Sequence, residues 1–317
     1  MNPAENWRPT ATHAALARRA RLLRDIRDFF SHRDILEVET PLLSAAGNTD
    51  PEIQPVRTDS GGYLRTSPEF ALKRLLAAGC GDIFELGRVF RAAESGRRHN
   101  PEFTLLEWYR TGTDYHRLMD EVAALVRFCG GEKFSHWKEE RLSYRQLFLR
   151  HLGIDPLTAD AGLLAATAEK HGITDVKLEQ RQWLDLLISF VIQPDLPTDR
   201  LTFVHDFPAE QAALARIRPG NPPVAERFEL YLGQTELANG YQELTDADEQ
   251  RRRFNAENAE RGKRGLPECD IDERLVAALE HGLPECAGVA LGVDRLQMAL
   301  GNHPSIDDVT AFPYSRA

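Results

Sequence analysis

Apolar side chains recur at helical spacing in several parts of the chain. Between residues 14 and 32 arginines occupy the opposite side of the pattern, which predicts an amphipathic helix with an apolar face of Leu16, Leu22, Leu23, Ile26, Phe29 and Phe30. A second helix is expected from Ser67 to about Ala78, with Ser67 as its N-cap and Pro68 at its first position. Further helices are expected over 115–128 and 246–264.

Alternating apolar and polar residues predict strands elsewhere. Residues 82–91 and 102–109 are expected to form two antiparallel strands around a long charged loop. Other strands are expected over 38–41, 50–67 (a hairpin around Gly61-Gly62), 201–207, 225–243 and 289–293, the last running into a helix. Residues 130–200 are expected to form a helical insertion. This mixture agrees with an α+β fold of antiparallel sheet and flanking helices.

Composition and charge limit the classes of protein to consider. The 317 residues can bury a large core, and the formal charge of −10 disfavours a general attraction to tRNA. No apolar run is long enough to span a membrane, so we expect a cytoplasmic protein without membrane contact. The four cysteines lack the paired short spacing of a zinc site or a disulfide framework.

Basic residues precede the strand 102–109, which offers an aromatic face and a carboxylate. Arg97 and Arg98 lie in the loop, and Arg91 ends the preceding strand. Arg295 is distant from these residues in the sequence and lies in the first turn of the helix that follows the strand 289–293. Arginines hold phosphates and a flat ring stacks on a base, so this combination suits a nucleoside triphosphate.

Two glutamates in the segment 226–239 are candidate metal ligands. If Leu232-Gly233 is a two-residue hairpin loop, Glu229 and Glu236 lie opposite each other. Like charges across a sheet repel, so a divalent cation between them would stabilise the pair. A three- or four-residue loop would instead place them on different faces as solvated glutamates.

Two strand faces combine polar groups suited to an amino acid. Asn239, Tyr241 and Glu243 alternate along one strand, although an exposed edge strand would show the same pattern. On the other hairpin Phe103, Leu105, Glu107 and Tyr109 share a face. Phe103 by itself is typical of a core residue, whereas a buried Glu107 needs a partner such as an ammonium group.

These segments resemble the three motifs of class II aminoacyl-tRNA synthetases. Motif 1 resembles residues 29–43, motif 2 the hairpin 82–109, and motif 3 the stretch 288–295. The sequence is similar to that of lysyl-tRNA synthetases in four segments: Thr66-Ser-Pro-Glu69, His99-Asn-Pro-Glu-Phe103, Glu236-Leu-Ala-Asn-Gly-Tyr-Gln-Glu243 and Gly292-Val-Asp-Arg295. Within that superfamily the chain most resembles the short paralogues that ligate (R)-β-lysine to elongation factor P.

The resemblance implies one class II catalytic domain over residues 1–317, with the helical insertion at about 130–200 and no anticodon-binding domain. It also implies a homodimer formed through motif 1. The expected ATP-binding residues are Arg91, Ala92, Ala93, Asn100, Phe103, Glu236, Leu237, Gly292 and Arg295, of which Arg91 (on the α-phosphate) and Arg295 (on the γ-phosphate) are catalytic. Glu229 and Glu236 would bind Mg²⁺. The expected substrate-binding residues are Ser67, Pro68, Glu69, Glu107, Tyr109, Asn239, Glu243 and Ala290, with Asn239 on the substrate carboxylate and Glu243 on its side-chain ammonium.

Two positions depart from the lysyl-tRNA synthetase pattern. Those enzymes read Arg-Asn-Glu-Gly where this chain reads Arg91-Ala92-Ala93-Glu94, so the acidic residue is displaced by one. They also have glycine where this chain has Ala290. We hypothesise that the added methyl group reshapes the pocket in favour of a β-amino acid.

The expected reaction is a two-step acyl transfer that uses ATP and Mg²⁺. The substrate carboxylate attacks the α-phosphate of ATP, and an amine then takes the acyl group from the adenylate. The resemblance makes (R)-β-lysine the substrate and a lysine of elongation factor P the acceptor, without stable tRNA binding. The alternatives are a stand-alone enzyme that charges tRNA or makes a free amide, and a catalytically silent amino-acid sensor.

Overall fold

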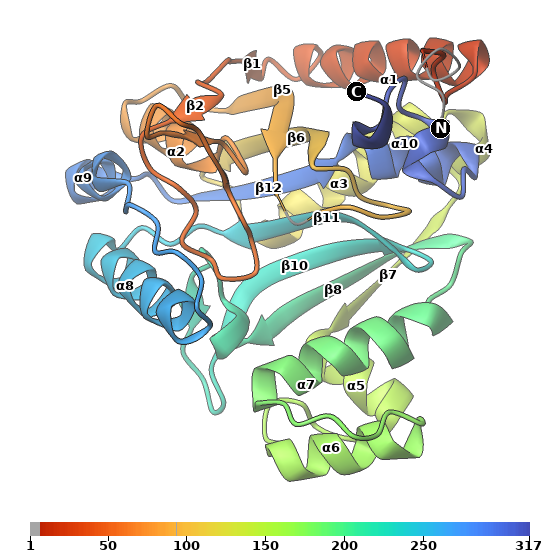
Figure 1. Cartoon of the computed structure of the whole chain (residues 1–317). Coiled ribbons are helices and arrows are strands. Elements are labelled where there is room, and N and C mark those ends of the chain that lie inside the picture. The colour runs from red at the N-terminus through yellow and green to blue at the C-terminus, as the bar shows by residue number, and fades with distance from the viewer. Residues whose placement is uncertain (1–6, 93) are drawn as a thin grey trace.

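A single mixed sheet forms the centre of the protein (Figure 1). The computed structural model describes residues 7–92 and 94–317. The strands follow the order β1 (Leu36–Glu37), β5 (Ile83–Phe90), β6 (Glu102–Thr111), β12 (Cys286–Gly292), β11 (Thr235–Gln242), β10 (Val224–Leu232), β8 (Arg200–Pro208) and β7 (Lys138–Ser143), with β9 (Ile217–Arg218) beside β10. The six strands from β5 to β8 pair antiparallel, and the outermost pairs, β1 with β5 and β7 with β8, are parallel. The predicted α+β fold is confirmed.

The predicted helices are present and cover the sheet. The main apolar core lies between the sheet and α1 (His13–Ser31), α3 (Tyr115–Gly130) and α10 (Val293–Gly301). A second group, α2 (Glu69–Ala77), α8 (Ala247–Lys263) and α9 (Glu273–Gly282), shares another apolar cluster with β5 and β6. A short helix, α4 (Glu132–Ser135), follows α3. Among the described residues no helix is long and apolar enough to cross a lipid bilayer.

The N-terminal elements differ slightly from the prediction. The extended chain expected over 38–41 contains no strand, since β1 covers only Leu36–Glu37 just before it. Helix α2 begins at Glu69, so Pro68 is its N-cap and not its first residue, although the Ser67 hydroxyl does accept the Glu69 N–H at 2.9 Å. The predicted hairpin is confirmed as β3 (Val56–Arg57) and β4 (Tyr63–Leu64), which form a small sheet with β2 (Leu43–Ser44).

The segment expected to be a helical insertion also contains a strand. Helices α5 (Tyr144–Leu152), α6 (Ala161–Lys170) and α7 (Gln180–Leu187) pack together at the β7 edge of the sheet, and α7 continues as a π-helix over Ile188–Ile192 (Figure 1). Strand β7 precedes them and pairs with β8. The prediction of helix alone was wrong here because β7 is short and mostly charged, so its sequence carries little apolar alternation. Short 3₁₀ turns occur at Gln193–Asp195, Ala209–Gln211, Ile306–Asp308 and Tyr314–Arg316.

The hairpin of β10 and β11 has a different register from the one predicted. Leu232 faces Thr235, so the turn residues are Gly233 and Gln234, and Gly233 takes the left-handed conformation that the turn requires (φ 53°). A bulge follows, after which Glu229 faces Asn239 and not Glu236. Tyr231 faces Glu236, and Glu229 lies two positions before Tyr231. The two glutamates therefore still project from the same face of the sheet.

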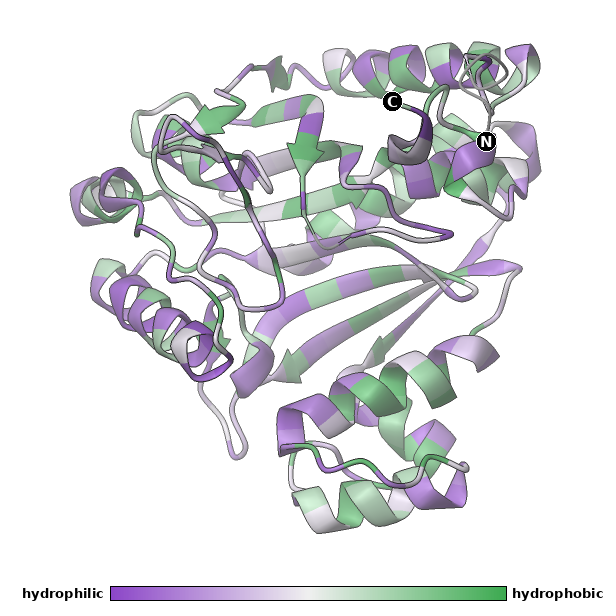
Figure 2. Ribbon diagram, in the orientation of Figure 1, coloured by the Kyte–Doolittle hydropathy of each residue, from purple (hydrophilic) through white to green (hydrophobic). Residues whose placement is uncertain are grey.

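Strand alternation separates the core from the functional face. On β6, Leu106 and Trp108 point into the main core, while Leu105, Glu107 and Tyr109 line a cavity on the other face. Figure 2 shows the resulting alternation of hydropathy along the strands and the hydrophilic character of α8. The sheet thus presents a polar floor at the strands that carry the sequence motifs.

Candidate active site

One cavity of about 180 Å³ brings together most of the residues that the sequence nominated. Its wall includes Ser67, Glu69, Arg91, Asn100, Phe103, Glu107, Tyr109, Glu236, Leu237, Asn239, Glu243, Ala290, Gly292 and Arg295. These residues come from the segment before α2, from α2, from the loop between β5 and β6, and from β6, β11 and the residue after it, β12 and α10, so segments more than 200 positions apart meet here. Of the other nominated residues, Pro68 lines a neighbouring cavity, Glu229 lines a cavity that it shares with Glu236, Ala92 lies outside these walls, and Ala93 lies outside the described residues.

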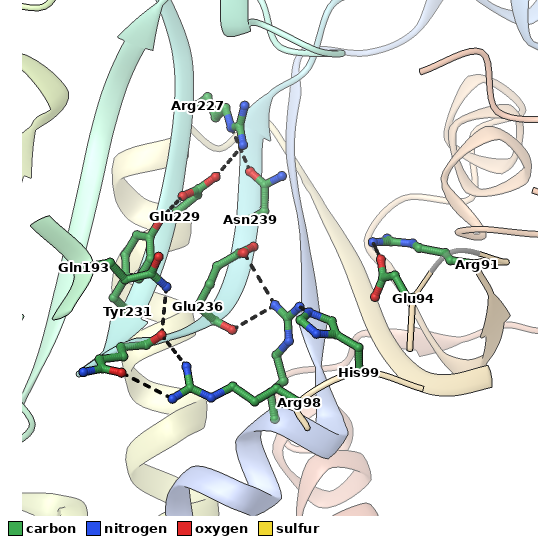
Figure 3. A network of polar contacts seen from close by, with 12 residues as sticks. Arg91, Glu94, Arg98, His99, Gln193, Arg227, Glu229, Tyr231, Glu236 and Asn239 are labelled. Carbon is green, nitrogen blue, oxygen red and sulfur yellow. Dashed lines mark hydrogen bonds and ion pairs between the residues drawn. The ribbon is translucent and has the colours of Figure 1, made fainter. Parts of the chain in front are cut away.

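Arg91 lies at the aromatic end of the cavity. Its guanidinium carbon is 5.2 Å from the centre of the Phe103 ring, a cation–π distance. Its Nη1 forms an ion pair with Glu94 at 3.0 Å (Figure 3). The backbone N–H of Ala92, an expected ATP-binding residue, donates to the Gln54 carbonyl at 2.8 Å. Arg91 is therefore placed beside a ring that can stack on a base, and Glu94 is its ion-pair partner.

Arg295 joins helix α10 to the β5–β6 loop. Its Nη2 lies 2.5 Å from His99 Nε2, and its Nη1 contacts Glu236 at 3.5 Å. Burial and the positive charge of Arg295 lower the pKa of His99, so the ring is neutral and accepts the guanidinium N–H. Arg98 of the same loop donates to the Gln234 carbonyl at 2.9 Å. The loop is thus tied to both the hairpin turn and the arginine.

Asn100 lines the cavity, but its amide is bonded elsewhere. Its Nδ2 donates to the Glu102 carbonyl at 2.7 Å, and its Oδ1 accepts the N–H of Tyr314 at 2.9 Å. The side chain therefore fastens the C-terminal turn against the start of β6. Any contact of Asn100 with a nucleotide would have to use its remaining amide hydrogen or its backbone.

Glu229 and Glu236 offer carboxylates to a cation. Glu229 is buried and accepts hydrogen bonds from Arg227 and from the Tyr231 hydroxyl, whereas Glu236 is partly exposed. Burial raises the pKa of Glu229; Arg227 opposes this rise and the nearby charge of Glu236 adds to it. Among the described residues no group of three or more histidine, cysteine or acidic side chains has the geometry of a metal site. The two carboxylates line one cavity, and oxygen donors of this kind are those that a magnesium ion would accept.

The sequence matches one established family over almost its whole length. Residues 4–316 match the model of the tRNA synthetases class II (D, K and N). The chain belongs to this class II synthetase family. The elongation factor P–(R)-β-lysine ligase of Pectobacterium carotovorum subsp. carotovorum (strain PC1) is 49% identical to it, with both chains covered completely. The ligases of that name from Yersinia enterocolitica and Vibrio cholerae serotype O1 are 48% and 49% identical, with at least 98% of each chain covered.

The class II sheet positions an amide and a tyrosine at the far end of the cavity. Arg227 donates to Asn239 Oδ1 at 3.1 Å, and Asn239 Nδ2 donates to the Tyr241 hydroxyl at 2.8 Å. The amide is thereby oriented and keeps one N–H free for a carboxylate. Ala290 lies between Asn239 and Glu107 in the strand register.

Glu107 is buried in this end of the class II cavity. Ser67 Oγ donates to its Oε1 at 2.6 Å, and the Tyr109 hydroxyl lies 3.4 Å from its Oε2. Burial, with the charge of Glu69, raises the pKa of Glu107 to about 8. An approaching ammonium group would reverse this effect, so the site suits a cationic substrate.

Some residues of the site were absent from the sequence prediction. Asn48 and Ile53 belong to the segment between β2 and β3, which crosses in front of the sheet (Figure 1), and they line the cavity. Lys73 of α2 is buried and contacts two of the nominated glutamates. The spacing of Glu69 and Lys73, four positions apart on a helix, was an available signal, although such pairs are usually exposed.

Proposed function

We propose that this protein activates (R)-β-lysine with ATP and transfers it to the ε-amino group of a lysine of elongation factor P. The name shared by relatives of about 48% identity over full length supports the substrate and the acceptor. The observation that carries the proposal is the convergence of Arg91, Arg295 and Phe103 with the buried carboxylate Glu107 in one cavity. A triphosphate and a cationic acid can be held there side by side.

The first step forms an acyl-adenylate. A carboxylate oxygen of the amino acid bonds to the α-phosphorus of ATP, and the bond from that phosphorus to the bridging oxygen breaks, releasing pyrophosphate. Arg91 would hold the α-phosphate and Arg295 the γ-phosphate, replacing their present contacts with Glu94 and Glu236. Asn239 would orient the attacking carboxylate through its free amide hydrogen.

The second step transfers the acyl group. The acceptor amine attacks the adenylate carbonyl, AMP leaves, and the amine nitrogen loses a proton. Magnesium bound by Glu229 and Glu236 would supply charge neutralisation at the phosphates. No side chain of the protein is needed as a nucleophile, because both steps depend on positioning and on charge neutralisation.

Substrate choice is assigned to the pocket around Glu107 and Ala290. Ala290 lies on β12, where it pairs with Asn239 of β11 and with Glu107 of β6. Its methyl group would change the space between the ammonium group and the carboxylate of a bound amino acid. We further propose a cytoplasmic homodimer without stable tRNA binding, since its acceptor is a translation factor. The segment 130–200 would be an insertion in one catalytic domain.

Exchange of labelled pyrophosphate into ATP tests the activation step. (R)-β-Lysine should drive the exchange, and α-lysine should drive it less well. Absence of exchange with any amino acid would favour the silent sensor. Exchange followed by acylation of tRNA would favour the stand-alone synthetase.

A further inference from the structure

Helix α8 packs on the protein with few apolar side chains. Its buried residues are Gln250, Phe254 and Arg261, which are spaced so that they share one face of the helix. Only one of the three is apolar, and most other residues of the helix are charged or polar (Figure 2). The attachment of α8 to the rest of the protein therefore depends strongly on polar contacts.

Arg261 is 2% exposed, and its hydrogen bonds all go to carbonyl oxygens. Its Nε donates to the Pro267 carbonyl at 2.7 Å, and its Nη1 donates to the carbonyls of Asp50 at 3.1 Å and Ile53 at 3.5 Å. Its Nη2 donates to the side-chain oxygen of Gln54 at 3.3 Å. Because none of these partners is a carboxylate, the buried guanidinium is stabilised only while the oxygens stay in place.

Three of these partners belong to one wall of the active-site cavity. Residues 48–54, called the front wall below, cross in front of the sheet (Figure 1), and Asn48 lines the cavity. The Gln54 carbonyl accepts the N–H of Ala92 at 2.8 Å, and Ala92 directly follows Arg91. The front wall thus connects α8 with the residue expected to hold the α-phosphate.

Two other contacts join the front wall to α8 and its C-cap. The Thr49 hydroxyl donates to the Glu257 carboxylate, and this bond holds a single residue of the wall. The ion pair of Glu52 with Arg264 is partly exposed, with side chains 56% and 30% exposed, so solvent screens it. Arg261 instead binds three residues of the wall from a buried position, and we expect it to contribute most to the placement of the wall.

We propose that Arg261 is a positioning residue that holds the front wall against the active-site cavity and thereby sets the affinity for both ATP and the amino acid. It acts through the wall, since Arg261 itself does not line the cavity. Without it the wall would be in place for only a fraction of the time, and the apparent KM of each substrate would rise by the inverse of that fraction. Saturating substrate would draw the wall back into place, so kcat would be retained. The inference rests on the proposed function for the identity of the amino acid.

Arg261→Ala tests the proposal in pyrophosphate exchange. The KM for ATP and the KM for (R)-β-lysine should each rise at least about tenfold, the effect of one lost charge-assisted hydrogen bond, while kcat changes by less than about twofold. A general loss of folded protein would do the reverse, lowering kcat and leaving both KM values unchanged. Arg252→Ala is the matched control, because Arg252 is an exposed arginine of α8 that pairs with Glu249 of the same helix. It should leave all three constants unchanged.

Added guanidinium ion gives a second readout that general damage would not produce. At non-denaturing concentration it should lower both KM values of Arg261→Ala towards wild type, because its planar donors fit the space left by the side chain. Ammonium ion lacks this geometry and should have less effect. Unchanged KM values in Arg261→Ala, a loss of kcat alone, or equal effects of the two cations would overturn the proposal.

Gln54→Met decides the question if Arg261→Ala does not fold. It removes one acceptor of the guanidinium without changing α8, so both KM values should rise about fivefold, the value of about one hydrogen bond. Wild-type KM values in Gln54→Met would then overturn the proposal.

Direct binding of ATP, measured by calorimetry, separates this inference from the proposed function. If no amino acid drives exchange by the wild-type protein, the proposed reaction fails, and the Kd for ATP still tests the role of Arg261. A Kd at least about tenfold weaker in Arg261→Ala than in Arg252→Ala supports that role, and equal Kd values overturn it. If α-lysine drives exchange in place of (R)-β-lysine, only the proposed substrate is wrong, and the KM values of the variants are compared with α-lysine.

Discussion

Glu107 is a buried carboxylate that is bonded by hydroxyl groups, and this makes substrate binding depend on pH. Its pKa is raised to about 8 by burial and by Glu69, against the opposing effects of Ser67, Arg91 and Arg65. The carboxyl group is therefore mostly protonated at neutral pH. An ammonium ligand favours its ionised form, so binding should release a proton.

The first prediction concerns this titration. Below the raised pKa the protein must lose a proton to bind its substrate, so kcat/KM for the amino acid in pyrophosphate exchange should rise with pH and level off above about 8. Glu107→Gln should remove this rise and lower kcat/KM by about 10- to 100-fold, the value of a charge-assisted hydrogen bond. A Glu107→Gln profile that still rises through pH 8 would show that another group titrates.

Ala290 provides the second prediction at the scale of one methyl group. Ala290→Gly should shift the ratio of kcat/KM values from (R)-β-lysine towards α-lysine by roughly tenfold, because one methyl group in a pocket is worth about that much discrimination. Pyrophosphate exchange with each amino acid measures the ratio. An unchanged ratio would remove Ala290 from the explanation of specificity.

The side chains of the site were largely predictable from sequence, but their partners were not. Alternation placed Glu107 and Asn239 on the correct faces because side-chain direction is a local property of a strand. The engagement of Asn100 by Tyr314 and of Glu243 by Lys73 depends on segments distant in the chain. The apolar and polar pattern within one segment does not indicate its contacts with distant segments.

Elements of the active-site sheet were predictable where strand and turn signals agree. Strands β5, β6 and β12 and helix α10 appear at the expected positions. There the changes in the apolar pattern coincide with glycine or charged residues in the sequence. The register of β10 and β11 was predicted wrongly because the turn lies at Gly233 and Gln234, one residue later than expected, and a bulge then displaces the later pairs by one more residue. Such a bulge adds a residue without a sequence signal of its own.

The third prediction tests how closely the central strands pack. A methyl group at Gly240 of β11 would lie 2.5 Å from the Phe228 ring and 2.9 Å from the Gly288 carbonyl. Gly240→Ala should therefore lower the free energy of unfolding by about 1–3 kcal/mol in urea denaturation. Gly162→Ala, on exposed helix α6 with only ordinary contacts, is the control and should stabilise by up to about 1 kcal/mol. Equal stabilities for the two variants would contradict this packing.

At the scale of the whole molecule, three exposed leucines lie within the segment that resembles motif 1. Leu36, Leu42 and Leu43 are 55%, 44% and 54% exposed. Apolar groups gathered in one exposed segment favour burial against a partner. The proposed homodimer would cover this segment.

The fourth prediction follows from that surface. Sedimentation should show a dimer for the wild-type protein, and Leu43→Glu should shift it towards the monomer because it places charge in the contact. Leu163→Glu changes a leucine of similar exposure, 46%, on helix α6 and should leave the dimer intact. A monomeric wild-type protein, or equal effects of the two variants, would remove motif 1 as the interface.

The identity of the acceptor is the claim that most depends on the molecule as a whole. The measurement that tests it most directly is the intact mass of elongation factor P after incubation with this protein, ATP, Mg²⁺ and (R)-β-lysine, with tRNA present in the same reaction. The expected result is a gain of one β-lysyl group on elongation factor P, absent without ATP and absent when its acceptor lysine is replaced. An unchanged mass of elongation factor P, with the amino acid recovered as adenylate or on tRNA, would contradict the account.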